Sequence, residues 1–375
     1  MKILIVRNMA QQINLNTYNN QELGLAKSLT RKGHQCDIVF YSKTNGNKIE
    51  RYTEDDITIN IYWMKGLNIY YNAIFLKLLF YGQLNSYDII QTHEYNQLMT
   101  FLLPYFTKKK LIIFHGPYKN ISKKFIHKLF DFFFLKKIVK NYPIAIAKSD
   151  LAKNYLLEKG FREVEVAGVG LDYKNFIETI PYEKSILNNY TKELNGNLKL
   201  LYIGRLDDNK NIIFLFDIVF EISKRNKNVK LILVGDGLPK DKQKYFDYMK
   251  ELGIEEHIIY IEKIEQTEVK YFYECADIFL LPSIIEIYGM VILEALYFNC
   301  PVITTLNGGS STILKDTYPE MIIKELDVVS WANRISEIVS SEYKTSEYIK
   351  NYFSWDSLSN KFLKTYMQLI NGDQI

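Results

Sequence analysis

Short apolar runs alternate with longer amphipathic segments along almost the whole chain, and this pattern constrains the fold more than any other feature. Two of the amphipathic segments, Asn20–Lys32 and Ser149–Lys159, end at Gly33 and Gly160, which is typical of helix C-termini. Between such segments, β-branched and apolar runs predict strands at Ile3–Val6, Cys36–Tyr41, Ile57–Trp63, Ile89–Thr92, Leu111–His115, Ile144–Ala147 and Val164–Val166. Apolar strands that alternate with helices predict a parallel sheet covered on both faces.

The alternation restarts in the second half, which predicts a second unit of the same kind. Strands are expected at Leu198–Ile203, Val229–Val234, His257–Ile261, Ile278–Leu281 and Val302–Thr304, with helices between them. Residues 181–197 are polar and have no period, so they predict a linker. We therefore expect an α/β chain of two doubly wound, Rossmann-like domains, 1–180 and 198–354, and a C-terminal helix over 355–375. In such folds ligands bind at the carboxyl ends of the strands.

Composition narrows the class of protein. A chain of 375 residues, 47% hydrophobic and 24% charged, suits two folded domains. The net charge of +4 does not indicate a nucleic-acid partner. Cys36, Cys275 and Cys300 are far apart, which favours buried thiols over a disulfide framework or a zinc site. We expect MKILIVR to be a buried strand and not a signal peptide, and no apolar run reaches the roughly 18–20 residues that span a bilayer.

Two cations follow the first strand of the second half. In the string LYIGRLDDNKN, Gly204 and Arg205 come directly after the strand, and Lys210 stands at the start of the next helix. A diphosphate leaving group needs positive charge and N–H donors of this kind. A surface loop with two solvated cations explains this fragment equally well.

Two glutamates flank a glycine in the string LPSIIEIYGMVILEA. Glu286 is expected in a loop, Gly289 opens a helix, and Glu294 lies on that helix. Eight positions span about 12 Å if helical, whereas a double-displacement glycosidase holds its carboxyls about 5–5.5 Å apart. The spacing suits two contacts along one extended ligand, with Gly289 and the helix N-terminus near a phosphate. Two ordinary surface glutamates remain the alternative.

The next strand is followed by Gly308-Gly309, whose backbone N–H groups could face an anion or a sugar. Together the strings GRLDDNKN, VGDG, ADIFLLPSIIEIYGMVILEAL and CPVITTLNGG resemble glycosyltransferase family 4, and FSWDSLSNKF is similar to the family's final helix. The resemblance implies a GT-B fold, a C-terminal helix that crosses back to the first domain, and retaining transfer of a sugar from a nucleotide-diphosphate sugar. It is strong over Leu198–Thr312 and looser before that.

The resemblance also implies roles for individual residues. Glu286, with His115 from the first domain, would lie against the transferred sugar, and Arg205 and Lys210 would stabilise the leaving diphosphate. Glu294 would hold the ribose hydroxyls. The remaining donor contacts would come from Gly204, Lys263, Ile264, Tyr288, Gly289, Met290 and Val291. Lys263 and Ile264 would edge the base.

The chain departs from the family pattern in two places. The first strand–helix loop, Asn8–Asn20, contains no Gly, so Asn16, Asn19 or Gln21 is expected to line the acceptor side instead, and His93 is a further candidate there. Glu262 stands where the family usually has a Gly, which leaves the base undetermined.

Charge stabilisation by Arg205, Lys210 and oriented amides could replace a metal ion, and the chain contains no Asp-x-Asp. We therefore expect no metal and no other cofactor. No residue is an obvious nucleophile.

A basic aromatic segment lies in the first half. Phe106–Lys140 contains ten lysines, one Asp and no Glu, with phenylalanines between them. Residues 121–140 could form a helix that binds an anionic membrane surface, or a core helix with a solvated lysine face. The first alternative would suit a glycan or lipid-linked acceptor and a cytoplasmic enzyme peripheral to the inner face of a prokaryotic cell membrane, in cell-surface polysaccharide or glycolipid synthesis.

Two other functions fit a scaffold of this kind. A nucleotide-sugar epimerase would need further acid/base carboxylates in the first domain, and the sequence does not reveal them. A non-catalytic partner protein would be expected to lose a member of the set Arg205, Lys210, Glu286 and Glu294, and all four are present.

Overall fold

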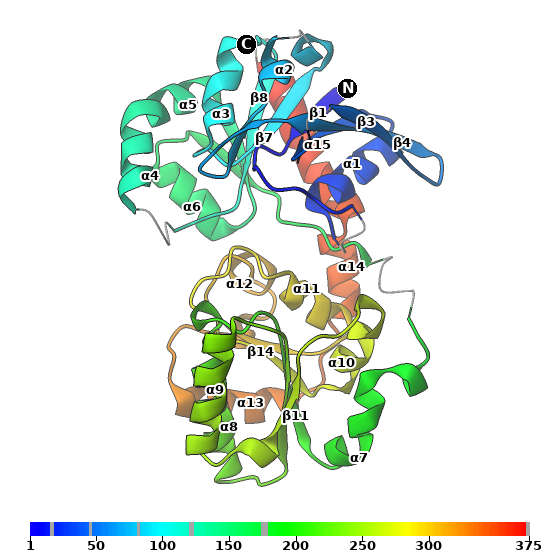
Figure 1. Cartoon of the computed structure of the whole chain (residues 1–375), viewed down its shortest axis with the longest axis vertical. Coiled ribbons are helices and arrows are strands. Elements are labelled where there is room, and N and C mark those ends of the chain that lie inside the picture. Colours follow the sequence, from blue (N-terminus) through cyan, green and yellow to red (C-terminus); the bar gives the residue numbers. More distant parts are fainter. Residues whose placement is uncertain (16–18, 45–46, 81–82, 120–123, 174–178, 373–375) are drawn as a thin grey trace. The chain divides into compact units, whose positions relative to one another are not determined.

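The computed structural model describes residues 1–15, 19–44, 47–80, 83–119, 124–173 and 179–372. The chain forms two compact units (Figure 1): Met1–Asp172 with Ser354–Ile375, and Tyr173–Phe353. Both are α/β units with parallel strands, and the expected doubly wound class is confirmed.

The sheet of the first unit has the strand order β10-β9-β8-β7-β1-β2-β4-β3. Its strands are β1 (Lys2–Val6), β2 (Gln35–Ser42), β3 (Lys48–Glu54), β4 (Ile57–Lys65), β7 (Ile89–His93), β8 (Lys110–His115), β9 (Ile144–Ala147) and β10 (Glu163–Val166). The sequence pattern missed β3, which pairs antiparallel with β4 at the edge of the sheet. Its residues, KIERYTE, are mostly charged or polar, which is common for an edge strand because charge discourages pairing with other chains.

The helices of this unit lie around the sheet (Figure 1). They are α1 (Gln21–Arg31), α2 (Leu76–Phe80), η1 (Gln83–Ser86), α3 (Leu98–Leu102), η2 (Leu103–Tyr105), α4 (Lys124–Phe130), the π-helical η3 (Asp131–Leu135), α5 (Lys136–Asn141), α6 (Asp150–Glu158) and α15 (Trp355–Asn371). A small antiparallel hairpin joins β5 (Leu67–Ile69) to β6 (Asn72–Ile74).

Helix α15 confirms that the C-terminal segment returns to the first unit. The indole of Trp355 fills space that two glycines leave, because a Cβ at Gly24 would lie 2.2 Å from its Nε1 and one at Gly170 would lie 2.5 Å from its ring. Ser28 of α1 donates a hydrogen bond of 2.8 Å to Asp356, and Tyr366 donates one of 2.7 Å to Gln91 of β7.

The sheet of the second unit has the order β13-β12-β11-β14-β15-β16, and its pairs are parallel. Its strands are β11 (Leu198–Ile203), β12 (Val229–Val234), β13 (Ile258–Ile261), β14 (Ile278–Leu281), β15 (Val302–Thr305) and β16 (Ile322–Ile323). The helices are η7 (Asp208–Lys210), α8 (Ile212–Ser223), α9 (Pro239–Glu251), η8 (Glu255–His257), η9 (Gln266–Glu268), α10 (Val269–Cys275), α11 (Met290–Tyr297), α12 (Ser310–Ile313), η10 (Pro319–Met321), α13 (Val328–Val339) and α14 (Ser346–Phe353).

Residues 181–197, which we expected to be a linker, are largely folded. They form η5 (Tyr182–Lys184), η6 (Ile186–Tyr190) and α7 (Thr191–Leu194), and they belong to the second unit. Leu187 and Leu194 are buried, and the amide of Ile186 donates a hydrogen bond of 2.8 Å to Glu268. Short 3₁₀ turns do not repeat with the α-helical period, so the pattern concealed them. The first unit accordingly runs to Asp172 and not to residue 180.

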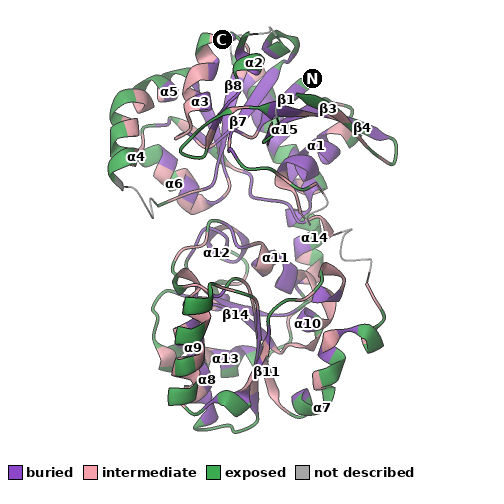
Figure 2. Cartoon of the chain, viewed as in Figure 1, coloured by how far each residue is buried: buried purple, intermediate pink, exposed green. Residues whose placement is uncertain are grey.

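The strands are the most buried part of each unit, and the outward faces of the helices are exposed (Figure 2). This arrangement leaves the carboxyl ends of the strands, with the loops that follow them, as the place where polar side chains can gather.

Candidate active site

The loops after β11 and β12 contact each other through their backbones. Gly235 has a left-handed φ of 144°, and a Cβ there would lie 1.8 Å from the carbonyl oxygen of Gly204. A Cβ at Gly237 would lie 2.2 Å from the carbonyl oxygen of Leu206. The glycines of the VGDG string therefore let these two loops form one surface at the carboxyl edge of the second unit.

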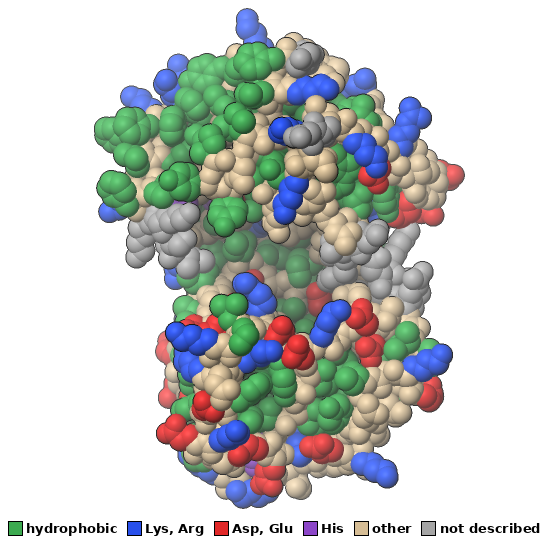
Figure 3. Space-filling model, viewed as in Figure 1, with side chains coloured by type: hydrophobic (Ala, Val, Ile, Leu, Met, Phe, Trp, Pro, Cys, Tyr) green, Lys and Arg blue, Asp and Glu red, His purple; other side chains and the backbone are tan. Residues whose placement is uncertain are grey.

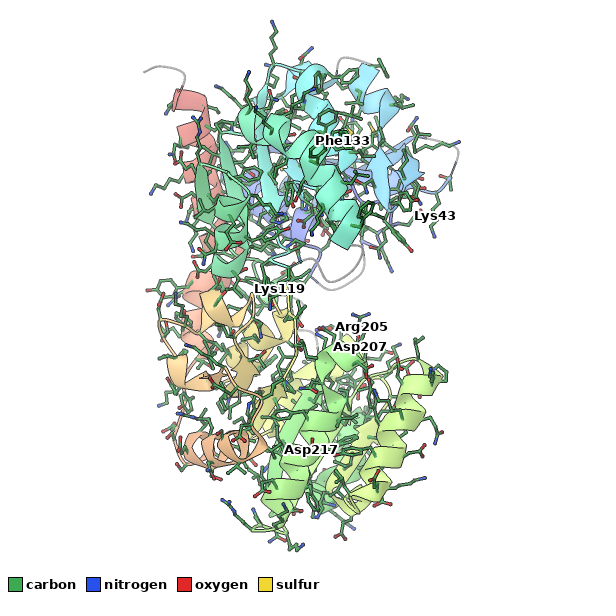
Figure 4. The ribbon with its side chains drawn as sticks, turned by 90° about the vertical axis from the view of Figure 1, so that its left-hand side faces the viewer. Lys43, Lys119, Phe133, Arg205, Asp207 and Asp217 are labelled. Atoms are coloured by element: carbon green, nitrogen blue, oxygen red, sulfur yellow. The ribbon has the colours of Figure 1, made fainter. Side chains whose placement is uncertain are left out.

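Arg205 projects from this surface. Its side chain is 80% exposed and lies 3.4 Å from the carboxylate of Asp207. Figure 4 shows Arg205 and Asp207 at the end of the unit, whereas Asp217 lies farther along on α8. An exposed guanidinium at the end of the central strand can bind an anion with little loss of existing contacts.

Lys210 and Glu286 form an ion pair. Lys210 ends η7, Glu286 lies in the loop after β14, and their side chains are only 14% and 17% exposed. The sequence placed these residues on different parts of a ligand. The structure brings their charged groups together, so the loops after β11 and β14 meet at this point.

Asn209 ties the same two loops together, and the sequence analysis missed it. Its Nδ2 donates a hydrogen bond of 2.8 Å to the carbonyl of Ile285, and its Oδ1 accepts one of 3.0 Å from the Ile285 amide. Its own carbonyl accepts a hydrogen bond of 2.8 Å from Ile284. The position between Asp208 and Lys210 was visible in the motif, but only the fold shows that its amide faces another loop.

The backbone of Gly308 and Gly309 packs closely against the loop that carries Glu286. The amide of Gly308 donates a hydrogen bond of 2.9 Å to the carbonyl of Glu286. A Cβ at Gly308 would lie 1.9 Å from the carbonyl oxygen of Ile287, and one at Gly309 would lie 1.7 Å from that of Tyr288. The Gly308 amide, which the sequence left as a possible contact for an anion or a sugar, thus already has a backbone partner.

Helix α11 begins at this loop. Gly289 precedes it with a left-handed φ of 67°, so the amides of Met290 and Val291 lie in the first turn, where helix N–H groups have no partner within the helix. Glu294, on the next turn, is buried, and Tyr273 donates a hydrogen bond of 2.9 Å to its carboxylate. Tyr273 is a second residue that the sequence analysis missed.

Lys263 and Ile264 follow β13, which is an edge strand of the same sheet. Lys263 is exposed and lies 2.9 Å from Glu265. Gly204, Arg205, Lys210, Lys263, Glu286 and the start of α11 thus share the carboxyl edge of one sheet.

The first unit holds a second polar cluster at the carboxyl edge of its own sheet. His115 ends β8 and is buried, with its Nδ1 2.5 Å from the carboxylate of Glu94. Glu94 follows β7 with a left-handed φ of 59°. Its carboxylate also accepts a hydrogen bond of 3.2 Å from the Gly116 amide and lies 4.0 Å from Lys148.

Glu94, which follows His93 in the chain, is a largely buried carboxylate whose side chain is 13% exposed. Burial alone would raise the pKa of Glu94, but His115, Lys148 and the Gly116 amide outweigh it and lower that pKa to about 2. Because Glu94 stays ionised at neutral pH, it suits the orientation and charge balance of His115 better than proton transfer.

His93 lies deeper than expected. It is buried, stands edge-on to Phe114, and has its Nδ1 3.6 Å from Glu22, which in turn lies 2.9 Å from Arg7. Burial lowers the pKa of His93 to about 4, so the ring is neutral at pH 7.

The other acceptor-side candidates differ in their settings. Asn19 adopts a left-handed φ of 54°, and its side-chain oxygen accepts a hydrogen bond of 3.1 Å from the Asp172 amide. Gln21 is the first residue of α1 and is half-buried. Asn16 lies outside the described residues.

Two family models match consecutive parts of the chain. "Glycosyltransferase Family 4" matches residues 23–174, and "Glycosyl transferases group 1" matches residues 188–354. The chain belongs to this glycosyltransferase family. It is a sugar-transferring enzyme, and the two matches fall on the two units.

This glycosyltransferase is similar to proteins across the prokaryotes. An uncharacterized glycosyltransferase of Methanocaldococcus jannaschii is 25% identical over 92% of each chain. A Campylobacter jejuni α-1,4-N-acetyl-D-galactosaminyltransferase, whose name gives a diphospho-undecaprenol-linked glycan as acceptor, is 28% identical over 58% of this chain and 56% of the relative.

Solved structures confirm the GT-B fold. Sucrose-phosphate synthase of Thermosynechococcus elongatus superposes with a TM-score of 0.73 at 17% identity, over 99% of this chain and 100% of that one. Anabaena HepE in complex with UDP and glucose superposes with a TM-score of 0.68 at 15% identity, over 98% of this chain and 100% of that one.

Among the residues that the structure describes, no group of three or more His, Cys, Asp or Glu side chains could hold a metal ion. No helix in the described part of the chain is long and apolar enough to cross a membrane.

Proposed function

We propose that this glycosyltransferase moves a hexose-type sugar from a nucleotide-diphosphate sugar to a glycan or lipid-linked acceptor, with retention of configuration and without a metal ion. The observation that carries the proposal is the Lys210–Glu286 ion pair. The sugar and the phosphate attached to it are neighbours in a donor, so the groups that bind them must be neighbours in the enzyme. A carboxylate for sugar hydroxyls beside an ammonium for phosphate meets that requirement.

The mechanism follows from where charge develops. When the sugar–phosphate bond breaks, positive charge grows on the sugar ring and negative charge on the leaving phosphate. Arg205, Lys210 and the amides of Met290 and Val291 would stabilise that negative charge, because they are fixed donors at one sheet edge. Bound phosphate would replace Glu286 as the partner of Lys210. The Glu286 carboxylate would then be available to accept hydrogen bonds from the sugar hydroxyls.

Four other residues are proposed to contact the donor. Glu294, held by Tyr273, would accept hydrogen bonds from the ribose hydroxyls. His115, oriented by Glu94, would contact the transferred sugar or its leaving phosphate. Lys263 and Ile264 would edge the base.

A panel of UDP-, GDP-, ADP- and dTDP-sugars tests the proposal, with thermal shift for binding and mass detection of released nucleotide for turnover. One base should shift the melting temperature, and nucleotide should be released faster when acceptor is present. Interconversion of the nucleotide sugar without release would indicate an epimerase instead. EDTA should leave transfer intact, and a loss that Mn²⁺ restores would contradict the metal-independent mechanism.

We further propose that the enzyme acts at the cytoplasmic, inner face of a prokaryotic cell membrane in cell-surface polysaccharide or glycolipid synthesis. The Campylobacter relative's undecaprenol-linked acceptor and a Staphylococcus aureus relative named for capsular polysaccharide biosynthesis, 27% identical over 50% of this chain, support this setting. The chain's own support is the α4–η3–α5 segment, which is exposed over most of its length and has Ile138 as its buried residue within the described part.

Helical residues in this segment begin at Lys124, and 121–123 lie outside the described residues. The exposure favours a surface role over a core helix. Vesicles that contain anionic lipid should sediment the protein at low salt and release it at high salt. Equal sedimentation with neutral vesicles would contradict the electrostatic part of this proposal.

A further inference from the structure

A groove of about 740 Å³ opens on the first unit between the β5–β6 hairpin and the α4–η3 helix. Tyr70 and Tyr71 line it from the hairpin, Ile126, Leu129 and Phe133 from the helix, and Leu98 from α3. Small-molecule sites usually measure about 300–1,000 Å³, so the groove is large enough for one ligand. It lies within the first unit, and neither Glu94 nor His115 lines it.

The side chains that form this groove are unusually exposed for their type. Tyr70 and Tyr71 are 73% and 72% exposed, and Phe133 is 58% exposed. Figure 3 shows hydrophobic side chains gathered over the part of the first unit where Figure 1 places α4 and α5, and Figure 4 shows Phe133 on that surface. Contiguous exposed apolar surface of this kind marks a binding site more often than chance.

The hairpin tip carries its aromatic residues at a conformational cost. Tyr70 and Tyr71 have φ values of 50° and 68°, which a two-residue hairpin turn of this type normally assigns to Asn, Asp or Gly. The backbone of the turn is held in place by the segment after β1, because the Ala10 amide donates a hydrogen bond of 2.8 Å to the Tyr71 carbonyl. Two tyrosines in strained positions on a fixed turn suggest that their rings serve a ligand.

The charge around the groove is positive. Lys128, Lys136 and Lys137 are exposed on the helical segment. Asp131, the one acidic residue of Phe106–Lys140, points inward, where Tyr95 donates a hydrogen bond of 3.1 Å to it and Lys159 lies 2.6 Å away. The outward face is therefore apolar and cationic, which complements an anionic lipid. The core of a protein interface is usually depleted of lysine, so a protein partner fits less well.

One end of the groove lies close to the His115 cluster. Asn96 and Gln97, which also line the groove, follow Glu94 and Tyr95 directly in the chain. The ring of Tyr95 stands 5.2 Å from that of His115, and Asn96 Nδ2 lies 3.2 Å from His127 Nδ1. A molecule with its apolar chain in the groove would thus have its polar end beside the carboxyl edge of β7.

We infer, on the basis of the proposed function, that this groove binds the hydrocarbon chain of the lipid-linked acceptor, a long prenyl chain that carries a phosphate-bearing head. Stacking on Tyr70, Tyr71 and Phe133 holds the chain, and the surrounding lysines hold the phosphate. The groove places the glycan end of the acceptor toward Glu94 and His115. The exposed aromatic residues outside the groove are then available to contact the bilayer.

Adjacent phenylalanines offer a matched pair of variants. Phe133 lines the groove, whereas Phe132 is 81% exposed and does not. Geranylgeranyl phosphate, kept below its micelle concentration, is titrated against the full chain without donor. Phe133→Ser should weaken binding about tenfold or more, as loss of a well-buried aromatic contact does, while Phe132→Ser stays within about twofold of the parent.

Two further measurements distinguish binding of the prenyl chain in the groove from binding of phosphate alone and from binding to a membrane surface. Inorganic phosphate should compete weakly, because most of the affinity comes from the chain. Sedimentation with anionic vesicles should depend more on Phe132 than on Phe133. Equal effects of both variants on geranylgeranyl phosphate, or full competition by inorganic phosphate, would overturn the inference. Nucleotide-sugar binding, measured by thermal shift, should be unchanged in both variants, so a failure of the donor panel would be a separate result.

Discussion

The charged groups at the carboxyl edges of the two sheets differ in how far they are exposed to solvent. In the second unit, Arg205 is 80% exposed and Lys210 is paired with Glu286 across two surface loops. In the first unit, the buried His115 contacts Glu94, which is 13% exposed, and Lys148 lies 4.0 Å from Glu94. The second unit therefore presents one exposed cation, Arg205, at its edge, whereas the charged groups described at the edge of the first unit are largely shielded from solvent.

This difference distinguishes charged side chains that can change their ion-pair partner when a ligand binds from charged side chains whose partner is fixed. Bound phosphate can replace Glu286 as the partner of Lys210, because the loops that carry both groups are held in place by the hydrogen bonds of Asn209 and Gly308. Separation of Glu94 from His115 would leave the largely buried Glu94 carboxylate without this partner, which is costly. We therefore expect the open edge to bind and release the donor, and the closed edge to act as a fixed electrostatic element.

Substitution of Glu286 tests the open edge with the largest expected effect. Glu286→Gln should lower kcat about 10²–10³-fold, because the carboxylate that faces the sugar is lost, while nucleotide affinity changes by less than about threefold. Steady-state kinetics and a nucleotide titration measure the two quantities separately. Glu337→Gln, an exposed carboxylate on α13, is the matched control and should change neither. Full activity in Glu286→Gln would place the donor site elsewhere.

Removal of the exposed cation gives the next largest effect. Arg205→Ala should weaken binding of a nucleoside diphosphate about tenfold to a hundredfold, since a charge-assisted hydrogen bond of this kind contributes about 1.5–3 kcal/mol. The loss should shrink as salt is added, because the group is exposed. Arg225→Ala, after α8, removes a cation of similar exposure and should have no effect. A salt-independent loss would contradict the open state of this edge.

The sequence predicted the open edge better than the closed one, and the reason is physical. Arg205, Lys210, Glu286 and Glu294 lie in short strings next to strands, so local patterns expose them. Glu94 contacts His115 only because β7 and β8 are neighbours in the sheet. Asn209 and Tyr273 depend likewise on contacts between distant segments. The strands were predictable from their β-branched runs, whereas β3, with its charged residues, and the short turns of 182–194 were not.

Substitution of Glu94 tests the closed edge. Glu94→Gln should lower kcat about tenfold to a hundredfold through His115, as expected when a charged hydrogen-bond partner is lost, with donor affinity unchanged. A purely structural role would lower stability and leave the pH profile of kcat as it was. A positioning role should also change that pH profile. Glu163→Gln, on β10 of the same sheet, is the control for an added amide in this unit.

The smallest expected effect is a loss of folding stability at acidic pH. It should occur in the first unit and not in the second. Because burial lowers the pKa of His93 to about 4, the folded first unit excludes a proton that the unfolded chain accepts near pH 6.5. The contribution is complete above pH 6.5 and declines as the pH falls toward 4, by about 1.4 kcal/mol per pH unit. Glu94, with its lowered pKa of about 2, adds a loss only below about pH 4.5.

Hydrogen exchange at pH 7 and pH 5 can therefore isolate His93. Strand peptides from β1, β7 and β8 should lose protection at pH 5 relative to peptides from β11 and β12 after correction for the intrinsic exchange rate. His93→Gln should reduce that difference by about 2 kcal/mol, since its side chain does not titrate. If β11 and β12 lose protection to the same extent, the acid sensitivity does not come from the buried cluster, and the contrast between the two edges is one of exposure alone.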